Sequence, residues 1–341
     1  MPGADVSLKD LEAQDARMVL AAARFTEREC GVSLSGARLV AALSGGADST
    51  ALLIMFCALR EKYGLALAAA HLDHALRPES AAEAQAAARL CASLNVPFFT
   101  RREPVGDLAR ALHCGLEEAG RRVRYEFLEQ CRRDFGARWV LTAHHVGDLA
   151  EDVLMRLSRG AVWPGLGGMK AVVDEPGRHL LRPLLMMEKK NLVAMLRRLH
   201  VPWQEDASNL SRTWKRNRMR HDVLPLFLAE NPSFYDNIRR LWLCARKDER
   251  DWKHRSQGML LTVNGGVLLP ASVLSSLGEA DLSRAVSDAV SSLGASPRFD
   301  TLNAVCLSWQ RRLFPKHFSF AGGVKADLSR RGLFLYRAPG R

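Results

Sequence analysis

The chain has 341 residues, of which 48% are hydrophobic and 25% are charged, as in an ordinary soluble globular protein of about two domains. No apolar run approaches the roughly 18 residues that span a bilayer, and the polar start MPGADVSLKDLEAQD is unlike a secretory signal. Length and composition therefore exclude a membrane protein and favour a cytoplasmic location.

The formal net charge is +12 and the pI is about 9.7. This charge favours a polyanionic partner, nucleic acid before membrane, and the alternative is a surface that is basic for solubility alone. The seven cysteines are scattered singly without a CxxC pair. The sequence therefore signals neither a zinc site nor a paired redox or sulfur-carrying site, and it fits a reducing compartment.

Short apolar runs alternate with helical patterns through the first half of the chain. The predicted strands are residues 40–43, 66–72, 96–101 and 137–145. The predicted helices are residues 50–61, 79–94, 115–136 and 148–160. This alternation favours a parallel sheet covered by helices on both faces, with ligands at the carboxyl ends of its strands.

The pattern becomes helical after about residue 185. GGVLLP and FAGGVKADLSRRGLFLYRAP then indicate small β elements in the last part of the chain. We therefore expect an α/β domain over residues 1–224. A smaller, mainly helical domain with a terminal β element is expected over residues 225–341.

The first predicted strand is followed by SGGADST and then by a helix. The two glycines allow a sharp turn whose N–H groups point at an anion, and the helix adds its positive dipole end. Asp48 would repel a bare phosphate, so it implies a bridging cation, most simply Mg²⁺. GxxxxGK[ST] is absent, so the loop is not of the kinase type; a glycine turn capped by Asp48 and Ser49 is the alternative. The predicted nucleotide-binding residues are Ser44, Gly45, Gly46, Ala47, Asp48 and Ser49, with Asp48 on the metal.

Two further polar motifs follow the second and fourth predicted strands. His71, in HLDHALRPES, is predicted to lie at the edge of the nucleotide. A metal shared with His74 and a loop that caps the next helix are the alternatives. Asp148 and Glu151 share one helix face because they are three residues apart. Paired acids at this edge can hold a metal, act as a base or receive an ammonium group, although a solvated helix start also favours acids.

Basic residues gather in two predicted helical segments. Arg121 and Arg124 share a face with Tyr125, and they suit an α-phosphate or an RNA backbone. The second segment combines Trp214 with four basic residues, which suits single-stranded RNA. These four are Lys215, Arg216, Arg218 and Arg220. A solvated basic face is the alternative for both segments.

The pattern SGGxDS after a first strand resembles the PP-loop ATP pyrophosphatases, whose fold is adenine nucleotide α-hydrolase-like and which split ATP between the α- and β-phosphates. Further motifs follow in the order of one family, the tRNA(Ile)-lysidine synthetases, and the chain is similar to its short form. These motifs are HLDHALRPES, GRRVRY, TAHH, SRG…GLGGM, RPLL and ED.SN…KRNRMR…LP. This resemblance also explains why the loop lacks the lysine of GxxxxGK[ST], because the anion that such a loop binds is the departing pyrophosphate.

This resemblance implies a reaction with ATP and Mg²⁺ as cofactors. ATP adenylates the 2-carbonyl oxygen of the wobble cytidine in a CAU-anticodon tRNA(Ile). The ε-amine of free L-lysine then displaces AMP and forms lysidine. An amide-like carbonyl oxygen is a poor leaving group, and its conversion to a phosphate ester corrects that.

The resemblance also implies roles for single residues. Asp48 would hold Mg²⁺ and pyrophosphate. Asp148 and Glu151 would hold the charged amine of lysine and help to deprotonate it. His144 and Arg121 match positions near the adenylate.

The tRNA is assigned by the resemblance to the basic helix faces. Arg124 and the four basic residues of 215–220 would bind it. Residues 1–224 would then be the catalytic domain, and residues 225–341 an accessory tRNA-binding domain. A homodimer stays open.

One segment departs from the family pattern HH-x-D-D-x-x-E-T. Gly147 replaces its first acid, and Asp152 replaces its hydroxyl. The two acids on the shared helix face are kept, so we expect activity to survive. The geometry of the helix start and the affinity for lysine are the properties that these replacements put in question.

Two rival functions remain. A PP-loop tRNA thiolase uses the same ATP chemistry but needs cysteines to handle sulfur, and no CxxC pair is present. A catalytically degenerate tRNA-binding protein is suggested by Gly147 and by the basic charge. The intact SGGADS loop argues against it, because an inactive site does not need Asp48.

Overall fold

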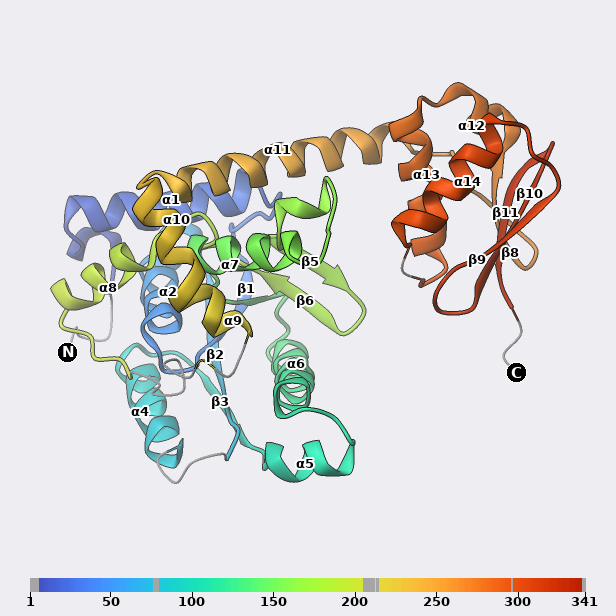
Figure 1. Ribbon diagram of the computed structural model, residues 1–341. Helices are drawn as coiled ribbons and strands as arrows, with labels where there is room; N and C mark the ends of the chain where they lie inside the picture. The colour runs from blue at the N-terminus through green and yellow to red at the C-terminus, as the bar shows by residue number, and fades with distance from the viewer. Residues whose placement is uncertain (1–5, 76–79, 205–211, 213–214, 296, 339–341) are drawn as a thin grey trace. The chain divides into compact units, whose positions relative to one another are not determined.

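The computed structural model describes residues 6–75, 80–204, 212, 215–295 and 297–338. Within them, no helix combines the length and the apolar character needed to cross a bilayer. The chain divides into two compact units, the first ending at Ala245 and the second beginning at Arg246 (Figure 1).

A six-stranded sheet forms the centre of the first unit, with the strand order β3-β2-β1-β4-β6-β5. Its strands are β1 (Arg38–Ala42), β2 (Ala66–Asp73), β3 (Phe98–Arg102), β4 (Trp139–Leu141), β5 (Val172–Glu175) and β6 (Arg178–Leu181). Strands β1, β2, β3, β4 and β6 run parallel, and β5 at the edge runs antiparallel to β6. The predicted parallel α/β sheet is confirmed.

Helices cover both faces of this sheet (Figure 1). The helices of this unit are α1 (Ala13–Arg28), α2 (Ala47–Ala58), α3 (Arg60–Tyr63), α4 (Ser80–Ser93), α5 (Val105–Ala111), α6 (Leu116–Asp134), α7 (Val146–Leu157), α8 (Lys189–Arg198), α9 (Lys215–Arg218) and α10 (Leu224–Glu230), and α11 (Phe234–Arg255) runs on into the second unit. Leu39 and Ala41 of β1 pack with α1, α2, α4 and α8 on one face. Val40 packs with α6 on the other. Because successive strand residues point to opposite faces, a strand buried on both sides reads as the continuous apolar run LVAA.

The order of the strands brings the polar motifs to one edge of the sheet. Helix α2 follows β1 and α7 follows β4, and these two strands are neighbours in which Leu39 pairs with Trp139. Strand β6 lies beside β4 and is parallel to it. The segments after β1, β4 and β6 therefore meet at the carboxyl ends of the strands, where parallel sheets bind ligands.

The second unit contains an antiparallel sheet with the order β7-β8-β11-β10-β9. Its elements are β7 (Leu261–Val263), β8 (Gly266–Pro270), α12 (Ala271–Ser276), α13 (Glu279–Ser292), α14 (Phe299–Gln310), β9 (Lys316–Ser319), β10 (Val324–Ser329) and β11 (Gly332–Arg337). Val286 of α13 and Leu335 of β11 are fully buried in one apolar core. The predicted helical region with a terminal β element is confirmed.

The boundary between the two units falls later than the predicted one at residues 224/225. Leu224, Ile238 and Trp242 pack in one apolar cluster with residues of α7. Helix α10 and the first half of α11 therefore belong to the first unit. The sequence pattern shows that these helices are amphipathic, but it does not show which core they join.

Candidate active site

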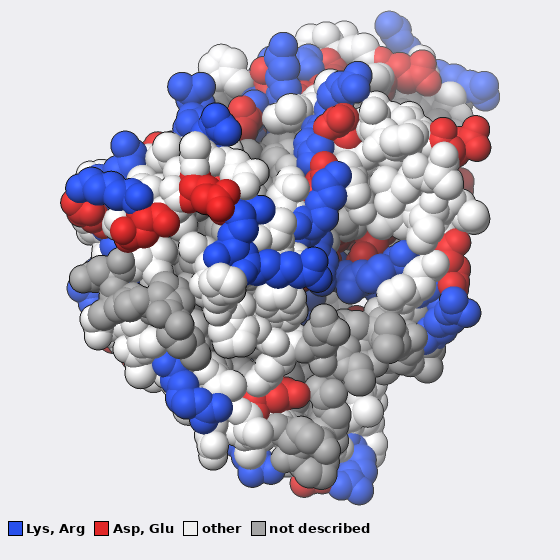
Figure 2. Space-filling view, turned by 90° about the vertical axis from the view of Figure 1, so that its left-hand side faces the viewer, with Lys and Arg blue, Asp and Glu red and all other residues white. Residues whose placement is uncertain are grey.

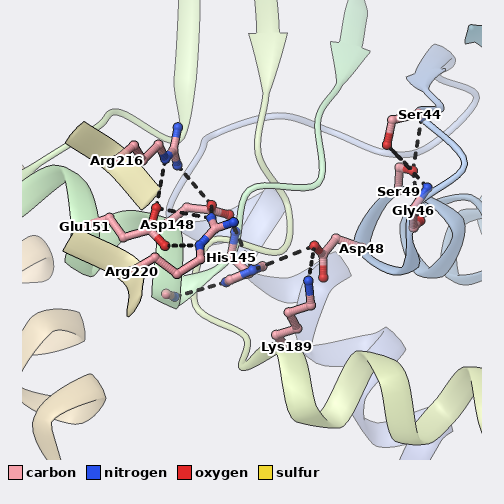
Figure 3. Close-up of polar contacts among 11 residues, drawn as sticks. Ser44, Gly46, Asp48, Ser49, His145, Asp148, Glu151, Lys189, Arg216 and Arg220 are labelled. Carbon is pink, nitrogen blue, oxygen red and sulfur yellow. Dashed lines mark hydrogen bonds and ion pairs between the residues drawn. The ribbon is translucent and has the colours of Figure 1, made fainter. Parts of the chain in front are cut away.

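The segment between β1 and α2 forms a tight loop at the carboxyl end of β1. Gly45 has φ +87°, a left-handed conformation that favours glycine. The Oγ of Ser49 accepts a hydrogen bond from the N–H of Ser44 at 3.1 Å and donates to the carbonyl of Gly46 at 3.1 Å. The same oxygen lies 3.0 Å from Ser44 Oγ. The hydroxyl groups thus hold the loop against the start of α2, whose first residue is Ala47 (Figure 3).

Asp48 lies in the first turn of α2 and has two differently placed oxygens. Its Oδ2 accepts a hydrogen bond from Lys189 Nζ at 3.1 Å, and His145 Nε2 lies 3.9 Å from the same oxygen. Its Oδ1 is buried and has no hydrogen-bond partner among the described residues. A buried polar atom without a partner is costly, so this oxygen has an acceptor position left for a donor or a cation from outside the described chain.

Asp148 and Glu151 lie on one face of α7, and both are buried. Arg216 donates to Asp148 Oδ1 at 2.9 Å and to Glu151 Oε2 at 2.8 Å. Arg220 donates to Glu151 Oε1 at 2.6 Å and to Asp148 Oδ1 at 3.1 Å. Figure 3 shows both guanidinium groups facing the carboxylates. The two negative charges of this acid pair, Asp148 and Glu151, are thus balanced by two cations of the chain itself.

The protonation states next to the acid pair are set by burial and by nearby charges. Burial by itself raises the pKa of Asp148, but His145 and Arg216 outweigh it and lower the pKa to about 2. Burial is the main reason that the pKa of His144 falls to about 3. Its Nδ1 lies 3.0 Å from Thr142 Oγ1. At neutral pH, Asp148 is therefore an anion and His144 is neutral.

His145 caps the start of α7 and explains how Gly147 is accommodated. Its Nδ1 accepts a hydrogen bond from the N–H of Gly147 at 3.0 Å, and its own N–H donates to Asp148 Oδ2 at 2.9 Å. A Cβ at position 147 would lie 2.8 Å from His145 Cε1, so an acid there would displace the capping ring. Asp152 accepts a hydrogen bond from Arg156 Nε at 2.7 Å. Both departures from the family pattern therefore fit a helix that begins normally.

Comparison with known proteins identifies the family. The PP-loop domain model matches residues 18–227. A tRNA(Ile)-lysidine synthase of Nitratidesulfovibrio vulgaris is 43% identical over 329 residues, which cover 90% of this chain and 94% of the relative. The chain belongs to the tRNA(Ile)-lysidine synthase family. It is an enzyme of the ATP-utilising PP-loop class, as the motifs predict.

Other members and neighbours differ in length and in chemistry. A tRNA(Ile)-lysidine synthase of Geobacter sulfurreducens is 35% identical, and the match covers 94% of this chain but 63% of that relative. Among solved structures, the U34-tRNA thiolase NcsA from Methanococcus maripaludis with its [4Fe-4S] cluster aligns with a TM-score of 0.54 at 16% identity, covering 68% of this chain and 79% of that one. The likeness to the thiolase shows the fold alone. Within the part of this chain that the structure describes, no group of three or more His, Cys, Asp or Glu residues is arranged to hold a metal ion.

Three further residues assigned from the lysidine synthase motifs lie around this edge of the sheet. His71 is buried, and its Nδ1 lies 2.9 Å from the carbonyl oxygen of Leu43, so it braces the strand end from which the phosphate loop starts. Arg121 is exposed on α6. Arg124 lies near it, with Nη2 3.3 Å from His74 Nε2. Since α6 and α2 cover opposite faces of the sheet, these two arginines are not part of the phosphate loop.

The four basic residues assigned to tRNA divide into two pairs. Lys215 and Arg218 are exposed, whereas Arg216 and Arg220 bind the acid pair (Figure 3). Lys and Arg side chains gather in a band across the middle of the face in Figure 2. Trp214, predicted to stack with RNA beside them, lies outside the described residues.

Three residues of the site were missed by sequence reasoning. One is His145, which lies between Asp48 and Asp148; only His144 of the TAHH motif was assigned. Lys189, the first residue of α8, brings an ammonium group to Asp48, and the EKK run after RPLL was its only signal. The N–H of Gln204 donates to the carbonyl of Gly45 at 2.9 Å, and its buried Oε1 has no partner among the described residues. Gln204 has no motif around it that would have singled it out.

Proposed function

We propose that this protein adenylates the 2-carbonyl oxygen of the wobble cytidine in CAU-anticodon tRNA(Ile) and then joins free L-lysine to that carbon, releasing pyrophosphate and AMP. The observation that best supports this proposal is that His145 lies between Asp48 of the phosphate loop and the acid pair. His145 Nε2 lies 3.9 Å from Asp48 Oδ2 and 3.5 Å from Asp148 Oδ2. A nucleotide site this close to a cation-binding acid pair suits a reaction in which an amine replaces AMP.

The ATP phosphates suit the loop at the start of α2. Backbone N–H groups and the helix dipole favour an anion there, and Lys189 adds a positive charge. Asp48 would hold Mg²⁺, because its Oδ1 is buried without a partner among the described residues and carboxylate oxygens are ligands that Mg²⁺ prefers. Mg²⁺ bound there supplies charge neutralisation for the departing pyrophosphate.

The first half-reaction makes the cytidine reactive. Its 2-carbonyl oxygen attacks the α-phosphorus of ATP, and pyrophosphate leaves. The oxygen then belongs to AMP, a far better leaving group, which the amine of lysine displaces from C2. His144 and Arg121 are proposed to lie near the adenylate. With a pKa of about 3, His144 contributes hydrogen bonds there without adding charge.

The acid pair is proposed to receive the ε-ammonium group of lysine. In the structure Arg216 and Arg220 already bind its oxygens, so the ammonium has to replace at least one guanidinium. With Arg216 in place the pKa of Asp148 is about 2, so in that state Asp148 is a weak base for an ammonium whose pKa is about 10.4. The acids are therefore proposed to bind and orient lysine while the arginines stay nearby, and the ε-ammonium gives up its proton to solvent before the free amine attacks C2.

The remaining assignments concern the tRNA. The exposed Lys215 and Arg218 are proposed to contact its backbone, and the second unit is proposed as an accessory tRNA-binding part. The reaction is proposed to take place in the cytoplasm.

A tRNA thiolase is less well supported. Burial raises the pKa of Cys57 to about 11 and that of Cys91 to about 12. Thiols that handle sulfur need the opposite shift, because the thiolate is the reactive form. The relatives named as lysidine synthases favour ligation of an amine over transfer of sulfur.

The test is transfer of labelled lysine to RNA. The full chain is incubated with ATP, Mg²⁺, radiolabelled lysine and a tRNA(Ile) transcript with a CAU anticodon. We expect label in the RNA only when ATP is present, and none in a matched transcript whose wobble cytidine is changed to uridine. Normal binding of the transcript with no transfer of lysine would show a binding protein instead.

A further inference from the structure

Four arginines gather around Tyr125 of α6. Arg121 and Arg124 lie on the same helix, Arg178 begins β6 and Arg182 follows it. The guanidinium carbons of Arg121 and Arg178 each lie 4.9 Å from the centre of the Tyr125 ring. Arg124 and Arg182 are close enough for the same tyrosine to influence their charge. We call the four residues the arginine cluster.

Several N–H groups of the arginine cluster lack a partner among the described residues. Arg182 is only 5% exposed; its Nη1 donates to the carbonyl of Lys170. The Nε atoms of Arg178 and Arg182 are both buried and unpaired within the described chain. Arg124 faces His74, whose pKa is lowered by burial to about 4 and which is therefore neutral at pH 7.

The arginine cluster has no directly paired carboxylate; Asp152 is close enough to raise the pKa of Arg182, but it pairs with Arg156. None of its members forms an ion pair with an acid of the described residues, whereas other arginines of the same unit do. These are Arg132 with Glu129, Arg156 with Asp152, and Arg198 with Asp15. Arg121 and Arg124 are exposed, but Arg182 is buried and Arg178 is half-buried. Burying a guanidinium without a directly paired opposite charge is costly. The arrangement therefore calls for an anion from outside the described chain.

The position of the arginine cluster relates it to the acid pair and not to the phosphate loop. Arg182 follows β6, which lies next to β4, the strand that leads to α7. It is close enough to His144 to lower the pKa of that residue. The phosphate loop leads into α2, and α2 and α6 cover opposite faces of the sheet.

We propose that the arginine cluster binds a phosphodiester of the RNA backbone beside the nucleotide that is modified. The inference rests on the proposed function and adds Arg178 and Arg182 to it. A planar guanidinium offers paired N–H donors to phosphate oxygens and also stacks on aromatic rings, so Tyr125 can hold Arg121 and Arg178 in place for the anion. The phosphates of ATP offer the same chemistry, but they have their own site at the start of α2.

The test measures RNA binding and ATP binding separately on the full chain. Arg178→Gln and Arg182→Gln are titrated with the CAU-anticodon transcript at several salt concentrations, and with ATP alone. Arg122→Gln is the matched control, because Arg122 lies on the same helix but pairs with Glu126 at 2.9 Å. Thermal unfolding reports whether each variant folds. Arg178 is only half-buried, so Arg178→Gln decides the outcome if the buried Arg182→Gln fails to fold.

We expect each cluster variant to bind the transcript about tenfold more weakly. The slope of log K against log salt should become shallower by about 0.7, the value for one phosphate of a single strand. ATP binding should change by less than about twofold, and Arg122→Gln should match the wild type.

Unchanged RNA affinity and salt slope in Arg178→Gln would overturn the proposal. Loss of ATP binding with intact RNA binding would overturn it too, and would assign the arginine cluster to the nucleotide. Failure of the proposed function is a separate result, because it appears as absent lysine transfer by a wild-type chain that binds the transcript.

Discussion

Two carboxylate sites lie close together at this edge of the sheet, and they differ in what surrounds their oxygens. Asp48 has one buried oxygen without a partner among the described residues, and the cation at its other oxygen is the half-exposed Lys189. Asp148 and Glu151 are buried, and two arginines already bind them. The first site has an oxygen left for a cation. The second can take a new cation only by exchange.

From this difference we expect Asp48 and the acid pair to act at different stages of the reaction. Lys189 occupies only one oxygen of Asp48, so under the proposed function ATP with Mg²⁺ would meet no cation of the chain at the other oxygen among the described residues. Under the proposed function, lysine at the acid pair would compete with the guanidinium groups of Arg216 and Arg220, which already bind it. We therefore expect the nucleotide site to act first, and the acid pair to act when the arginines give way.

The largest loss of activity is expected when Asp48 is removed. Asp48→Ala should lower the rate of pyrophosphate release by about 1000-fold, as for loss of one main electrostatic group, while tRNA affinity stays within about twofold. Single-turnover pyrophosphate release and filter binding measure the two quantities. Asp174→Ala, at an exposed acid paired with Arg138, is the control. An equal loss of tRNA affinity would contradict the role assigned to Asp48.

Replacing Lys189 tests whether α8 supplies the positive charge that the lysine of GxxxxGK[ST] gives in kinase-type loops. Lys189→Ala should slow pyrophosphate release by about 10- to 100-fold, because one positive charge near the leaving group is lost. Lys190→Ala is the matched control, since Lys190 pairs with Glu188 at 2.8 Å. If both variants slow the reaction equally, Lys189 has no special place at the phosphate.

The lowered pKa of His144, which lies beside the acid pair, can be tested through the pH dependence of stability. Its pKa is about 3 in the folded chain and about 6.5 when unfolded, so acidification from pH 7 to pH 5 protonates only the unfolded chain. Stability should fall over this range by about 2 kcal/mol through this residue. His144→Gln should remove that part of the pH dependence in urea unfolding, whereas a change at the exposed His254 should not. Equal pH dependence in wild type and His144→Gln would show that the half-buried His144 is not held neutral in the folded chain.

The smallest effect is expected at Lys215, whose replacement tests whether RNA binding and lysine binding depend on different residues. Lys215 is exposed, and its neighbour Arg216 binds the acids. Lys215→Ala should weaken tRNA binding about two- to fivefold and make the salt slope shallower by about 0.7, with the KM for lysine unchanged. A raised KM for lysine with an unchanged salt slope would contradict the assignment of Lys215 to RNA and of Arg216 to the acid pair.

Local patterns predicted the frame of the site. The apolar run that ends in SGGADST predicted the strand, the glycine turn and the helix start, because each depends on neighbouring residues only. The spacing of Asp148 and Glu151 predicted their shared face for the same reason. The strands of the parallel sheet followed from short apolar runs, while the β5–β6 hairpin and α1 were not predicted.

The contacts that define the state of the site depend on residues far apart in the sequence. A run of basic residues does not show which side chains turn inward, so Arg216 and Arg220 were assigned to RNA although they bind the acid pair. Lys189 reaches Asp48 only because α8 packs beside α2. Arg178 and Arg182 meet Arg121 through the sheet order, which places β6 beside β4.

The division of labour between the two sites is tested most directly by Glu151→Gln with two labels. One label is on the α-phosphate of ATP and the other is on lysine, with a CAU-anticodon transcript as acceptor and thermal unfolding as a check on folding. We expect labelled AMP to become attached to the RNA at near wild-type rate, while lysine transfer falls by at least about 100-fold. Equal loss of both labels, or undiminished lysine transfer, would contradict separate roles for Asp48 and the acid pair.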